Sequence, residues 1–326
     1  MEPWNESNQV REVGGPEVIE VRDLPVPSPK ANEVVVKIGA AGVNFIDVYN
    51  RQGRYQVPLP FVLGQEAAGT VATVGQGVKD VQPGERVAYT SVLGAYAEYA
   101  AVAADRLVKI PPPISDQQAA AAMLQGMTAH YLAHDTFPLK RGDTSLIHAA
   151  AGGVGLLLVQ IAHQIGARVI GTVSSTEKGD LARQAGADEI ILYTHSDFES
   201  ETRRLTHGKG VDVVYDSVGK TTFAKSLNTL RPRGMMVLFG GSSGAVPPFD
   251  PLVLTQKGSL FITRPSLTHY IITQEDLQSR ASRVFAMIEQ GQLKLRIEHL
   301  YALSAAQQAH RDLEGRKTTG KLLLIP

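Results

Sequence analysis

The chain has 326 residues, enough for two domains that each bury a core, and this length excludes a short peptide module or a disulfide knot. Its 32 Lys and Arg balance 32 Asp and Glu, so net charge gives no reason to expect nucleic acid or an anionic membrane as a partner. It contains no cysteine, which excludes disulfides, thiolate nucleophiles and cysteine-ligated zinc.

Residues 1–124 are predicted to form a mainly β, barrel-like sheet. Strands are expected at residues 33–38, 69–74, 86–89 and 96–101, between turns marked by Gly75, Gly77, Pro83, Gly84 and Gly94. The first ten residues show neither a basic nor an apolar signal segment, and the most apolar stretch, 147–162, is interrupted by glycines and Gln160. The sequence therefore predicts a soluble, cytoplasmic protein without a membrane span.

From residue 125 the pattern changes to apolar strands that alternate with amphipathic helices, which predicts an α/β domain with a doubly wound parallel sheet. Its strands are expected at residues 145–149, 168–173, 189–193, 211–216, 235–239 and 260–263. After Pro265 we expect a helix at 275–290, a strand at 295–299, a helix opened by a Ser304 and Gln307 capping box, and a strand at 322–325. This tail is too short for a domain and should pack back on the first one.

The strongest motif is His-Ala-Ala-Ala-Gly-Gly-Val-Gly at residues 148–155, between an apolar strand and a predicted helix at 156–165. It departs from G-x-G-x-x-G only at the first glycine, which is Ala150. Gly152 allows the backbone to approach a pyrophosphate at the helix N-terminus, and Gly155 allows close packing of helix on strand. The context favours a dinucleotide site of the Rossmann type over a tight turn of small residues.

The strand that follows this loop ends in Val-Ser-Ser-Thr-Glu-Lys at residues 173–178. A site that prefers NAD carries a carboxylate here for the ribose 2′-hydroxyl, but this chain has hydroxyl side chains and then Lys178. Small hydroxyls leave room for a 2′-phosphate and the ammonium group compensates its charge, so the pattern predicts NADPH. The alternative is that Lys178 is a solvated lysine and Glu177 binds the ribose.

Two further patterns do not carry a function. The Gly-Lys-Thr at residues 219–221 resembles the end of a phosphate-binding P-loop, but the P-loop pattern needs a glycine where the chain has Val214. His130 and His134 are four apart on a predicted helix, as in some zinc sites, but Tyr131 follows the first and no third ligand is spaced nearby. We interpret them as two histidines on a helix surface, and no metal is expected.

Beyond these motifs the chain resembles the zinc-independent quinone oxidoreductases, the ζ-crystallin-like group of the medium-chain dehydrogenase/reductase superfamily, over about 310 residues. The blocks that carry the resemblance are Gly-Val-Asn-Phe-Ile-Asp-Val-Tyr at 42–49, Gly-Gln-Glu-Ala-Ala-Gly at 64–69, the glycine loop, Val-Tyr-Asp-Ser-Val-Gly at 214–219 and Thr-Arg-Pro-Ser at 263–266. The zinc alcohol dehydrogenases of this superfamily place a cysteine near Asn44 and a histidine at Gln65. The family usually opens with a short apolar strand, whereas residues 1–9 are polar and interrupted by a proline, so the sequence leaves open whether this first strand forms.

The resemblance implies a GroES-like catalytic domain formed by residues 1–124 and 266–326, a dinucleotide-binding domain at 125–265, and a cofactor in the cleft between them. It implies that the nicotinamide end of NADPH is lined by Phe45, Tyr49 and Thr128. It places the pyrophosphate at Gly152, Gly153 and Val154, and the 2′-phosphate at Ser174, Lys178 and Tyr193. It implies that the ribose and nicotinamide are covered by Phe239, Gly240, Gly241, Ser242, Arg264, Pro265 and Ser266, with Arg316 at the rim. The alternatives are that Phe45 and Phe239 belong to the core, Tyr193 to a strand, and Arg316 to a helix end.

The predicted function is hydride transfer from NADPH to a quinone without a metal, with Asn44 and Tyr55 as the polar groups that face the acceptor. Tyr55 has a surface-loop aromatic as its alternative interpretation. Reduction of an activated carbon–carbon double bond, as in alkenal or enoyl reductases, remains open, and so does a non-catalytic role in RNA binding or as a structural crystallin. The apolar edge strand at 258–263 and the resemblance together predict a homodimer.

Overall fold

The computed structural model describes residues 4–326. Contacts divide the chain into a first unit, residues 4–127 with 271–326, and a second unit, residues 128–270. The division falls inside helix α2 (Asp116–Tyr131) and a few residues from the predicted domain boundaries. The assignment of these parts as catalytic and dinucleotide-binding domains stays a prediction.

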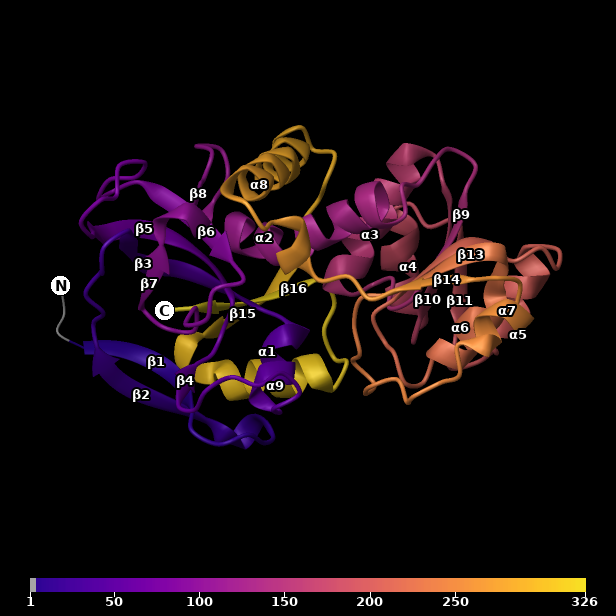
Figure 1. The fold of residues 1–326 in the computed structure, drawn as a ribbon, viewed down its shortest axis with the longest axis horizontal. Coiled ribbons are helices and arrows are strands. Elements are labelled where there is room, and N and C mark those ends of the chain that lie inside the picture. Colours follow the sequence, from indigo (N-terminus) through magenta and orange to yellow (C-terminus); the bar gives the residue numbers. More distant parts are fainter. Residues whose placement is uncertain (1–3) are drawn as a thin grey trace. The chain divides into compact units, whose positions relative to one another are not determined.

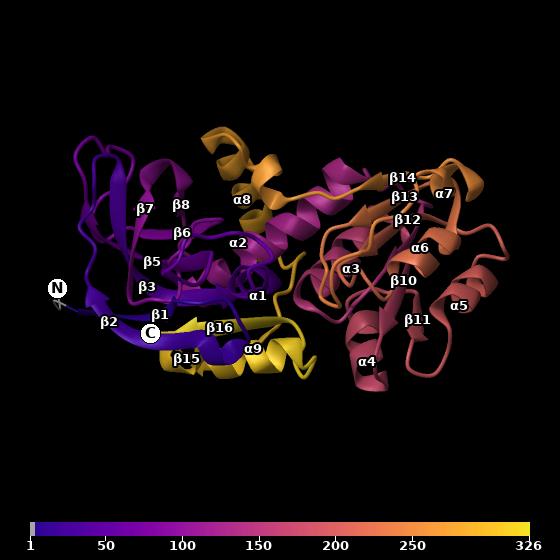
Figure 2. The ribbon, with the colours of Figure 1, turned by 60° about the horizontal axis from the view of Figure 1, so that its bottom comes forward.

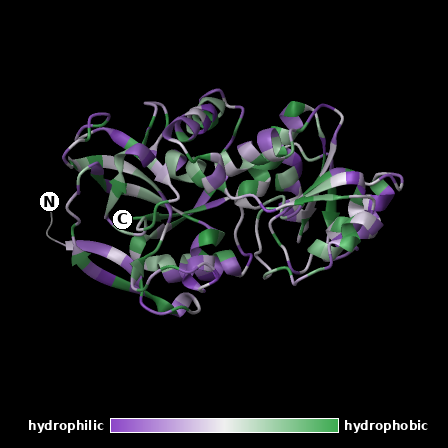
Figure 3. Cartoon of the chain, in the orientation of Figure 1, coloured by the Kyte–Doolittle hydropathy of each residue, from purple (hydrophilic) through white to green (hydrophobic). Residues whose placement is uncertain are grey.

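The second unit contains a six-stranded sheet in the order β11-β10-β9-β12-β13-β14 (Figure 1). Its strands are β9 (Thr144–Ile147), β10 (Arg168–Val173), β11 (Glu189–Leu192), β12 (Val211–Asp216), β13 (Leu230–Leu238) and β14 (Phe261–Thr263). Every neighbouring pair is parallel, which confirms the predicted doubly wound α/β fold. Strands of this kind are buried on both faces, and they appear mostly green in Figure 3.

Helices cover both faces of this sheet. They are α3 (Gly153–Ile165), α4 (Thr176–Gln184), α5 (Phe198–Leu205), α6 (Phe223–Thr229) and α7 (Leu252–Gln256). Figure 2 shows α3 and α4 on one side of the strands and α5 and α6 on the other. This connectivity places the loops that follow β9, β10, β12 and β13 at the carboxyl edge of the sheet, where ligands bind in open α/β folds.

The first unit is mainly β. Its strands are β1 (Trp4–Val10), β2 (Ile19–Pro25), β3 (Glu33–Val43), β4 (Phe61–Val62), β5 (Glu66–Val74), β6 (Arg86–Thr90), β7 (Tyr99–Ala103), β8 (Val108–Lys109), β15 (Ile297–Ala302) and β16 (Lys321–Ile325). Seven of them form a sheet in the order β15-β16-β3-β5-β6-β8, with β7 also paired to β3, and β2-β1-β4 form a second sheet. The tail of the chain therefore packs within the first unit, as expected, because β16 lies beside the long strand β3.

The first strand, which the sequence left open, is present where the structure describes the chain, since β1 pairs with β2 over its full length. Polar side chains enter the interior of this strand because backbone groups satisfy them. Asn5 is 5% exposed and its Oδ1 accepts from the backbone N–H groups of Glu98 and Tyr99, while Asn8 donates to the Leu303 carbonyl. Residues 1–3 of the predicted segment lie outside the described residues.

The helices of the first unit, besides most of α2, are α1 (Phe45–Arg51), α8 (Gln274–Glu289) and α9 (Ala306–Glu314). The predicted capping box that opens the last of these was wrong. Ser304 lies in a 3-10 turn, the N-cap is Ala305, and Gln307 instead donates to the Ile19 carbonyl. Among residues 4–326, none of the helices has both the length and the apolar character needed to cross a membrane.

Candidate active site

The glycine loop connects the end of β9 to the start of α3 in the second unit. A Cβ built on Gly155 would lie 2.2 Å from the Ala149 carbonyl oxygen, and one on Gly152 would lie 3.1 Å from the same atom. Ala149 itself has a left-handed backbone, with φ of 51°. The loop therefore turns back tightly on itself, and the first backbone N–H groups of α3 are left to bind a ligand, as a pyrophosphate cradle requires.

A buried histidine fixes the beginning of this loop. His148 is 2% exposed, with Nδ1 2.9 Å from the Thr172 hydroxyl and Nε2 2.9 Å from the Ser226 hydroxyl. Burial lowers the pKa of His148, so its ring stays neutral and bridges two hydroxyls. The Ala150 N–H also donates to the Thr172 carbonyl, which ties the loop to β10.

The side chains predicted to bind a 2′-phosphate gather at the carboxyl ends of β10 and β11. Val173 pairs with Leu192, so Ser174 and Tyr193 directly follow two neighbouring strands. Lys178 lies in the first turn of α4, which follows β10. Tyr193 is 40% exposed, which leaves its ring accessible at this edge. Their phosphate role stays a prediction.

The predicted covering segment, residues 239–242, follows β13 at the same edge of the sheet. The Phe239 and Gly240 N–H groups donate to the Asp216 carbonyl, so the segment is anchored at the end of β12. Arg264 donates from Nη1 to the carbonyls of Leu238 and Gly240, at 3.1 Å each. The segment 264–266 that follows β14 is therefore tied to the segment that follows β13. Within these segments Gly241 is buried, Ser242 and Pro265 are half-buried, and Ser266 is exposed.

In the first unit, α1 carries the aromatic residues assigned to the nicotinamide. The ring of Tyr49, 7% exposed, lies with its centroid 6.1 Å from that of Phe45 and 6.0 Å from that of Tyr55. The Arg54 guanidinium lies 5.1 Å from the Tyr49 centroid. Tyr55 is 44% exposed, so the structure brings the three rings together with Tyr55 on the outside.

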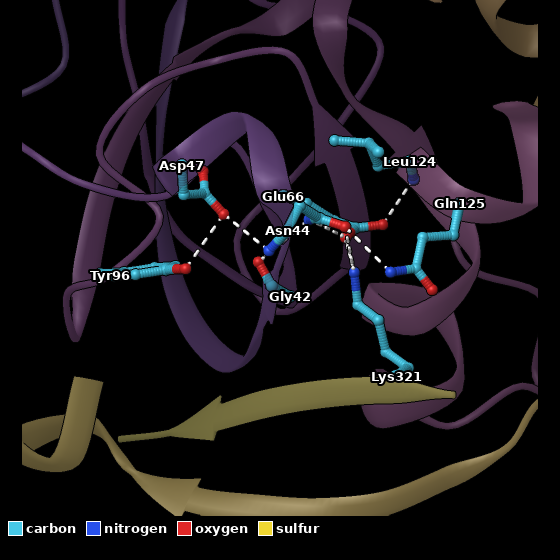
Figure 4. Close-up of polar contacts among 8 residues, drawn as sticks. All are labelled: Gly42, Asn44, Asp47, Glu66, Tyr96, Leu124, Gln125 and Lys321. Carbon is cyan, nitrogen blue, oxygen red and sulfur yellow. Dashed lines mark hydrogen bonds and ion pairs between the residues drawn. The ribbon is translucent and has the colours of Figure 1, made fainter. Parts of the chain in front are cut away.

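Asn44, the N-cap of α1, belongs to a buried polar cluster together with Glu66 and Lys321 (Figure 4). Its Nδ2 donates to Glu66 Oε2 at 2.8 Å and to the Gly42 carbonyl at 3.2 Å, and its Oδ1 accepts from Lys321 Nζ at 2.8 Å. Both amide hydrogens of Asn44 are therefore used within the protein. A direct bond from Asn44 to an acceptor would require one of these contacts to open.

Asp47 connects this cluster to a second chain of polar side chains. Its Oδ2 accepts from the Asn44 backbone N–H at 2.9 Å and from the Tyr96 hydroxyl at 3.0 Å. Burial raises the pKa of Asp47 to about 7, against the lowering effect of these hydrogen bonds and of Lys321. Asp47 therefore changes its charge near neutral pH.

The second chain has a fixed direction. Arg51 Nη1 lies 2.9 Å from His310 Nδ1, and a guanidinium only donates, so Nδ1 accepts. Burial lowers the pKa of His310 to about 3, so the ring is neutral and its proton is on Nε2. Nε2 lies 3.2 Å from the Tyr96 oxygen, and Tyr96 in turn donates to Asp47. At its outer end Arg51 forms an ion pair with Glu314 at 2.8 Å.

The remaining predicted residues are Thr128 and Arg316. Thr128 is buried in α2, and Arg316 is exposed with φ of 56° just after α9. The interpretation of both histidines as surface residues was wrong for His130, which is 5% exposed, with its ring centroid 4.5 Å from that of His134. Among residues 4–326, no group of three or more side chains is arranged to hold a metal ion.

The sequence analysis missed the roles of Glu66, Lys321, Tyr96 and His310. One signal was available, because Glu66 and Lys321 are single opposite charges at the starts of otherwise apolar strands. Their pairing could not be predicted, since it depends on the order β16-β3-β5.

A parallel sheet with a glycine-rich turn before its first helix, in a chain that also contains a mainly β unit, defines the class of dinucleotide-dependent dehydrogenases and reductases. Residues 30–112 match the family described as "Alcohol dehydrogenase GroES-like domain", and residues 153–286 match the one described as "Zinc-binding dehydrogenase".

Named relatives match almost the whole chain. A "Quinone oxidoreductase" from Pseudomonas aeruginosa is 48% identical, over 96% of this chain and 97% of the relative. A "2-haloacrylate reductase" from Burkholderia sp is 42% identical, over 97% of this chain and 98% of the relative. The crystal structure of Escherichia coli quinone oxidoreductase complexed with NADPH superposes with a TM-score of 0.96 at 45% identity, covering 99% of this chain and all of that one. The chain belongs to the quinone oxidoreductase family of the medium-chain dehydrogenase/reductase superfamily.

Proposed function

We propose that this protein is an NADPH-dependent quinone reductase that works without a metal ion. The observation that carries the proposal is the near full-length likeness to quinone oxidoreductases at 48% identity, together with the glycine loop. The 45% identical Escherichia coli structure that contains NADPH supports the choice of cofactor. A cytoplasmic location is part of the proposal.

The residues of the second unit fit NADPH. At this cradle Gly153 and Val154 supply N–H groups at a helix N-terminus for the pyrophosphate, while the Gly152 N–H donates to the Ala149 carbonyl. Ser174, Lys178 and Tyr193 supply two hydroxyls and a cation at the carboxyl edge of the sheet, which is the chemistry that recognises a phosphate monoester. Bound there, NADPH supplies the hydride.

The acceptor makes modest demands on the protein. A quinone takes up a hydride readily because the product is an aromatic hydroquinone anion, which then takes a proton. The protein has to orient the acceptor, exclude water and stabilise the developing oxygen charge. We propose that Phe45 and Tyr49 pack beside the nicotinamide and that the Tyr55 hydroxyl faces the acceptor, since Asn44 uses both amide hydrogens internally.

Metal independence rests on the ligands that the sequence offers. The chain has no cysteine, and the positions near which its zinc-dependent relatives place ligands hold Asn44 and Gln65. Lys321 instead places its ammonium group against Asn44 and Glu66.

A second candidate reaction is reduction of an activated carbon–carbon double bond, favoured by the 42% identity to a 2-haloacrylate reductase. The deciding experiment measures NADPH oxidation with 1,4-benzoquinone, with a simple alkenal and with 2-chloroacrylate in parallel. Preference for benzoquinone supports the proposal, whereas preference for either alkene supports the second reaction. Binding of NADPH without turnover of any acceptor would contradict both and favour a non-catalytic role.

We expect the protein to prefer NADPH to NADH through Lys178 and Ser174. One charge-assisted hydrogen bond to a phosphate contributes about 1.5–3 kcal/mol, so Lys178→Ala should weaken NADPH binding roughly ten-fold to a hundred-fold and leave NADH unchanged. Ser174→Asp should reverse the preference by repelling the phosphate. Fluorescence titration measures both affinities, with Lys209→Ala, an exposed lysine after α5, as the control. Equal binding of both cofactors by the parent protein would show that the interpretation is wrong.

We also propose a homodimer formed through the edge strand β14. This strand ends the parallel sheet, and Phe261 is 56% exposed on it. Sedimentation velocity at micromolar concentration should give a dimer for the parent and a shift toward monomer for Phe261→Glu. Leu300→Glu, at the exposed edge strand β15, is the control and should stay dimeric. A monomeric parent would contradict the proposal.

A further inference from the structure

The register of three neighbouring strands brings Lys321, Asn44 and Glu66 into one cluster. In the sheet of the first unit, β3 lies between β16 and β5. Leu322 pairs with Val43, so Lys321 comes opposite Asn44. Ala67 pairs with Ala41, so Glu66 comes opposite Gly42 on the other side of β3. The cluster is thus a consequence of strand order, and its three side chains are at most 3% exposed.

The contacts in this cluster permit one orientation of the Asn44 amide (Figure 4). The Lys321 ammonium only donates, so it fixes Oδ1 of Asn44, and the Glu66 carboxylate only accepts, so it fixes Nδ2. Lys321 and Glu66 also form an ion pair with each other. The other oxygen of Glu66 accepts from the Leu124 backbone N–H in α2, which holds the carboxylate in place.

The backbone leaves room for this pair at Gly42. A Cβ at this position would lie 2.2 Å from Glu66 Oε2 and 2.7 Å from Lys321 Nζ. The φ of Gly42 is not in the left-handed region, so the turn geometry does not require a glycine here. Space for the ion pair is therefore the physical reason for glycine at this position.

A gain in folding stability does not explain why the buried ion pair of Lys321 and Glu66 is present. Removing two charges from water costs more than their attraction in the interior commonly returns, and apolar side chains of similar volume often stabilise a fold equally well or better. The pair does, however, contact the N-cap of α1 on both sides of its amide. Asn44 is the N-cap of the helix that carries Phe45 and Tyr49, one residue and five residues further on.

We propose that Lys321 and Glu66 are positioning residues for the reduction: by locking the Asn44 amide they fix the start of α1 and thereby the aromatic side chains assigned to the nicotinamide. The inference rests on the proposed function, because that function gives Phe45 and Tyr49 their role. Lys321 acts through Asn44 and is not itself assigned a contact with the acceptor.

The test uses the double variant Lys321→Met/Glu66→Gln, which removes both charges and leaves neither one buried and unpaired. We expect it to fold and to bind NADPH within about two-fold of the parent, because the phosphate-binding residues lie in the second unit and are unchanged. Single-turnover oxidation of NADPH by benzoquinone should slow about ten-fold or more, as for misplaced reactants. Amide hydrogen exchange in residues 45–51 should accelerate by a similar factor.

A matched control and a second variant complete the design. Lys109→Met/Glu85→Gln removes an exposed ion pair of the same kind, 3.0 Å long, and should change none of these readouts. Gly42→Ala keeps both charges but displaces them, and should reproduce the slow turnover with intact NADPH binding. It also replaces the double variant if that protein does not fold.

The outcomes separate this inference from the proposed function. A parent that turns over no quinone overturns the proposed function and, with it, this role. If the parent is active, a variant with a turnover rate and α1 exchange within about two-fold of the parent overturns the positioning role alone. Slow turnover with weak NADPH binding would also overturn it, since the defect would then lie in cofactor binding.

Discussion

Replacing Gly155 by alanine is expected to abolish measurable NADPH binding and to destabilise the second unit. The added Cβ would lie 2.2 Å from the Ala149 carbonyl oxygen and 3.0 Å from the Ala149 carbonyl carbon, and these are backbone atoms that no rotamer change can move. The loop and α3 must separate to make room, which withdraws the N–H groups of the cradle. Overpacking of this kind costs about 1–3 kcal/mol.

Isothermal titration with NADPH and chemical unfolding measure the two effects. Gly179→Ala, in α4 of the same unit, is the matched control, because its Cβ meets side-chain atoms at 3.1 Å or more. We expect this control to keep or slightly raise stability, since alanine favours a helix interior over glycine by up to about 1 kcal/mol. NADPH binding by Gly155→Ala that equals the parent's would mean that the loop does not hold the cofactor.

Asp47→Asn is expected to stabilise the protein most above neutral pH and clearly less near pH 5. With its pKa raised to about 7, Asp47 keeps a proton in the folded protein at pH values where the unfolded chain has lost it. Its contribution to stability is therefore greatest at low pH and is lost as pH rises through 7. Asparagine carries no charge, and its oxygen can still accept from the Asn44 N–H and the Tyr96 hydroxyl.

The expected gain in the free energy of unfolding is on the order of 2–4 kcal/mol at pH 8 and about 1–2 kcal/mol at pH 5, because the unfolded chain already loses this proton near pH 4. The parent's own pH profile does not isolate the contribution of Asp47. Because the pKa of His310 is lowered to about 3, its contribution to the free energy of unfolding is lost as pH falls over a similar range. The difference between variant and parent does isolate it. Urea unfolding from pH 5 to 8 measures this difference, with Asp80→Asn, an exposed aspartate, as the control. A difference that stays constant with pH would contradict the raised pKa.

The parallel sheet was the part of the fold most open to prediction. The bounds of β10 and β12 agree with the predicted ranges, because a buried parallel strand is a continuous apolar run that ends at a turn residue. The sequence left β1 open because hydropathy does not register polar side chains whose partners are backbone groups far along the chain, as Asn5 and Asn8 have. The same reason applies to Ser304 and Gln307, where a contact with the Ile19 carbonyl took precedence over a local cap.

The candidate site also has a part that the sequence could predict and a part that it could not. The glycine loop and the strand end at Ser174 are local in sequence, so a pattern of eight residues was enough to indicate them. The cluster at Asn44 is not local, because Lys321 lies 277 residues from it. A single sequence carries the two charges but not the strand order that joins them.

The position of β16 has a consequence for the order in which the chain folds during synthesis. This strand lies between β15 and β3, so the sheet of the first unit is incomplete until residues 321–325 have left the ribosome. The second unit, by contrast, is one continuous stretch that ends at residue 270. At a translation rate of about 5–20 residues per second, the last 55 or so residues give the second unit several seconds in which to fold first. Until then the end of strand β3 at residues 41–43, where β16 pairs, has an open edge, and a nascent chain is most exposed to aggregation during this interval.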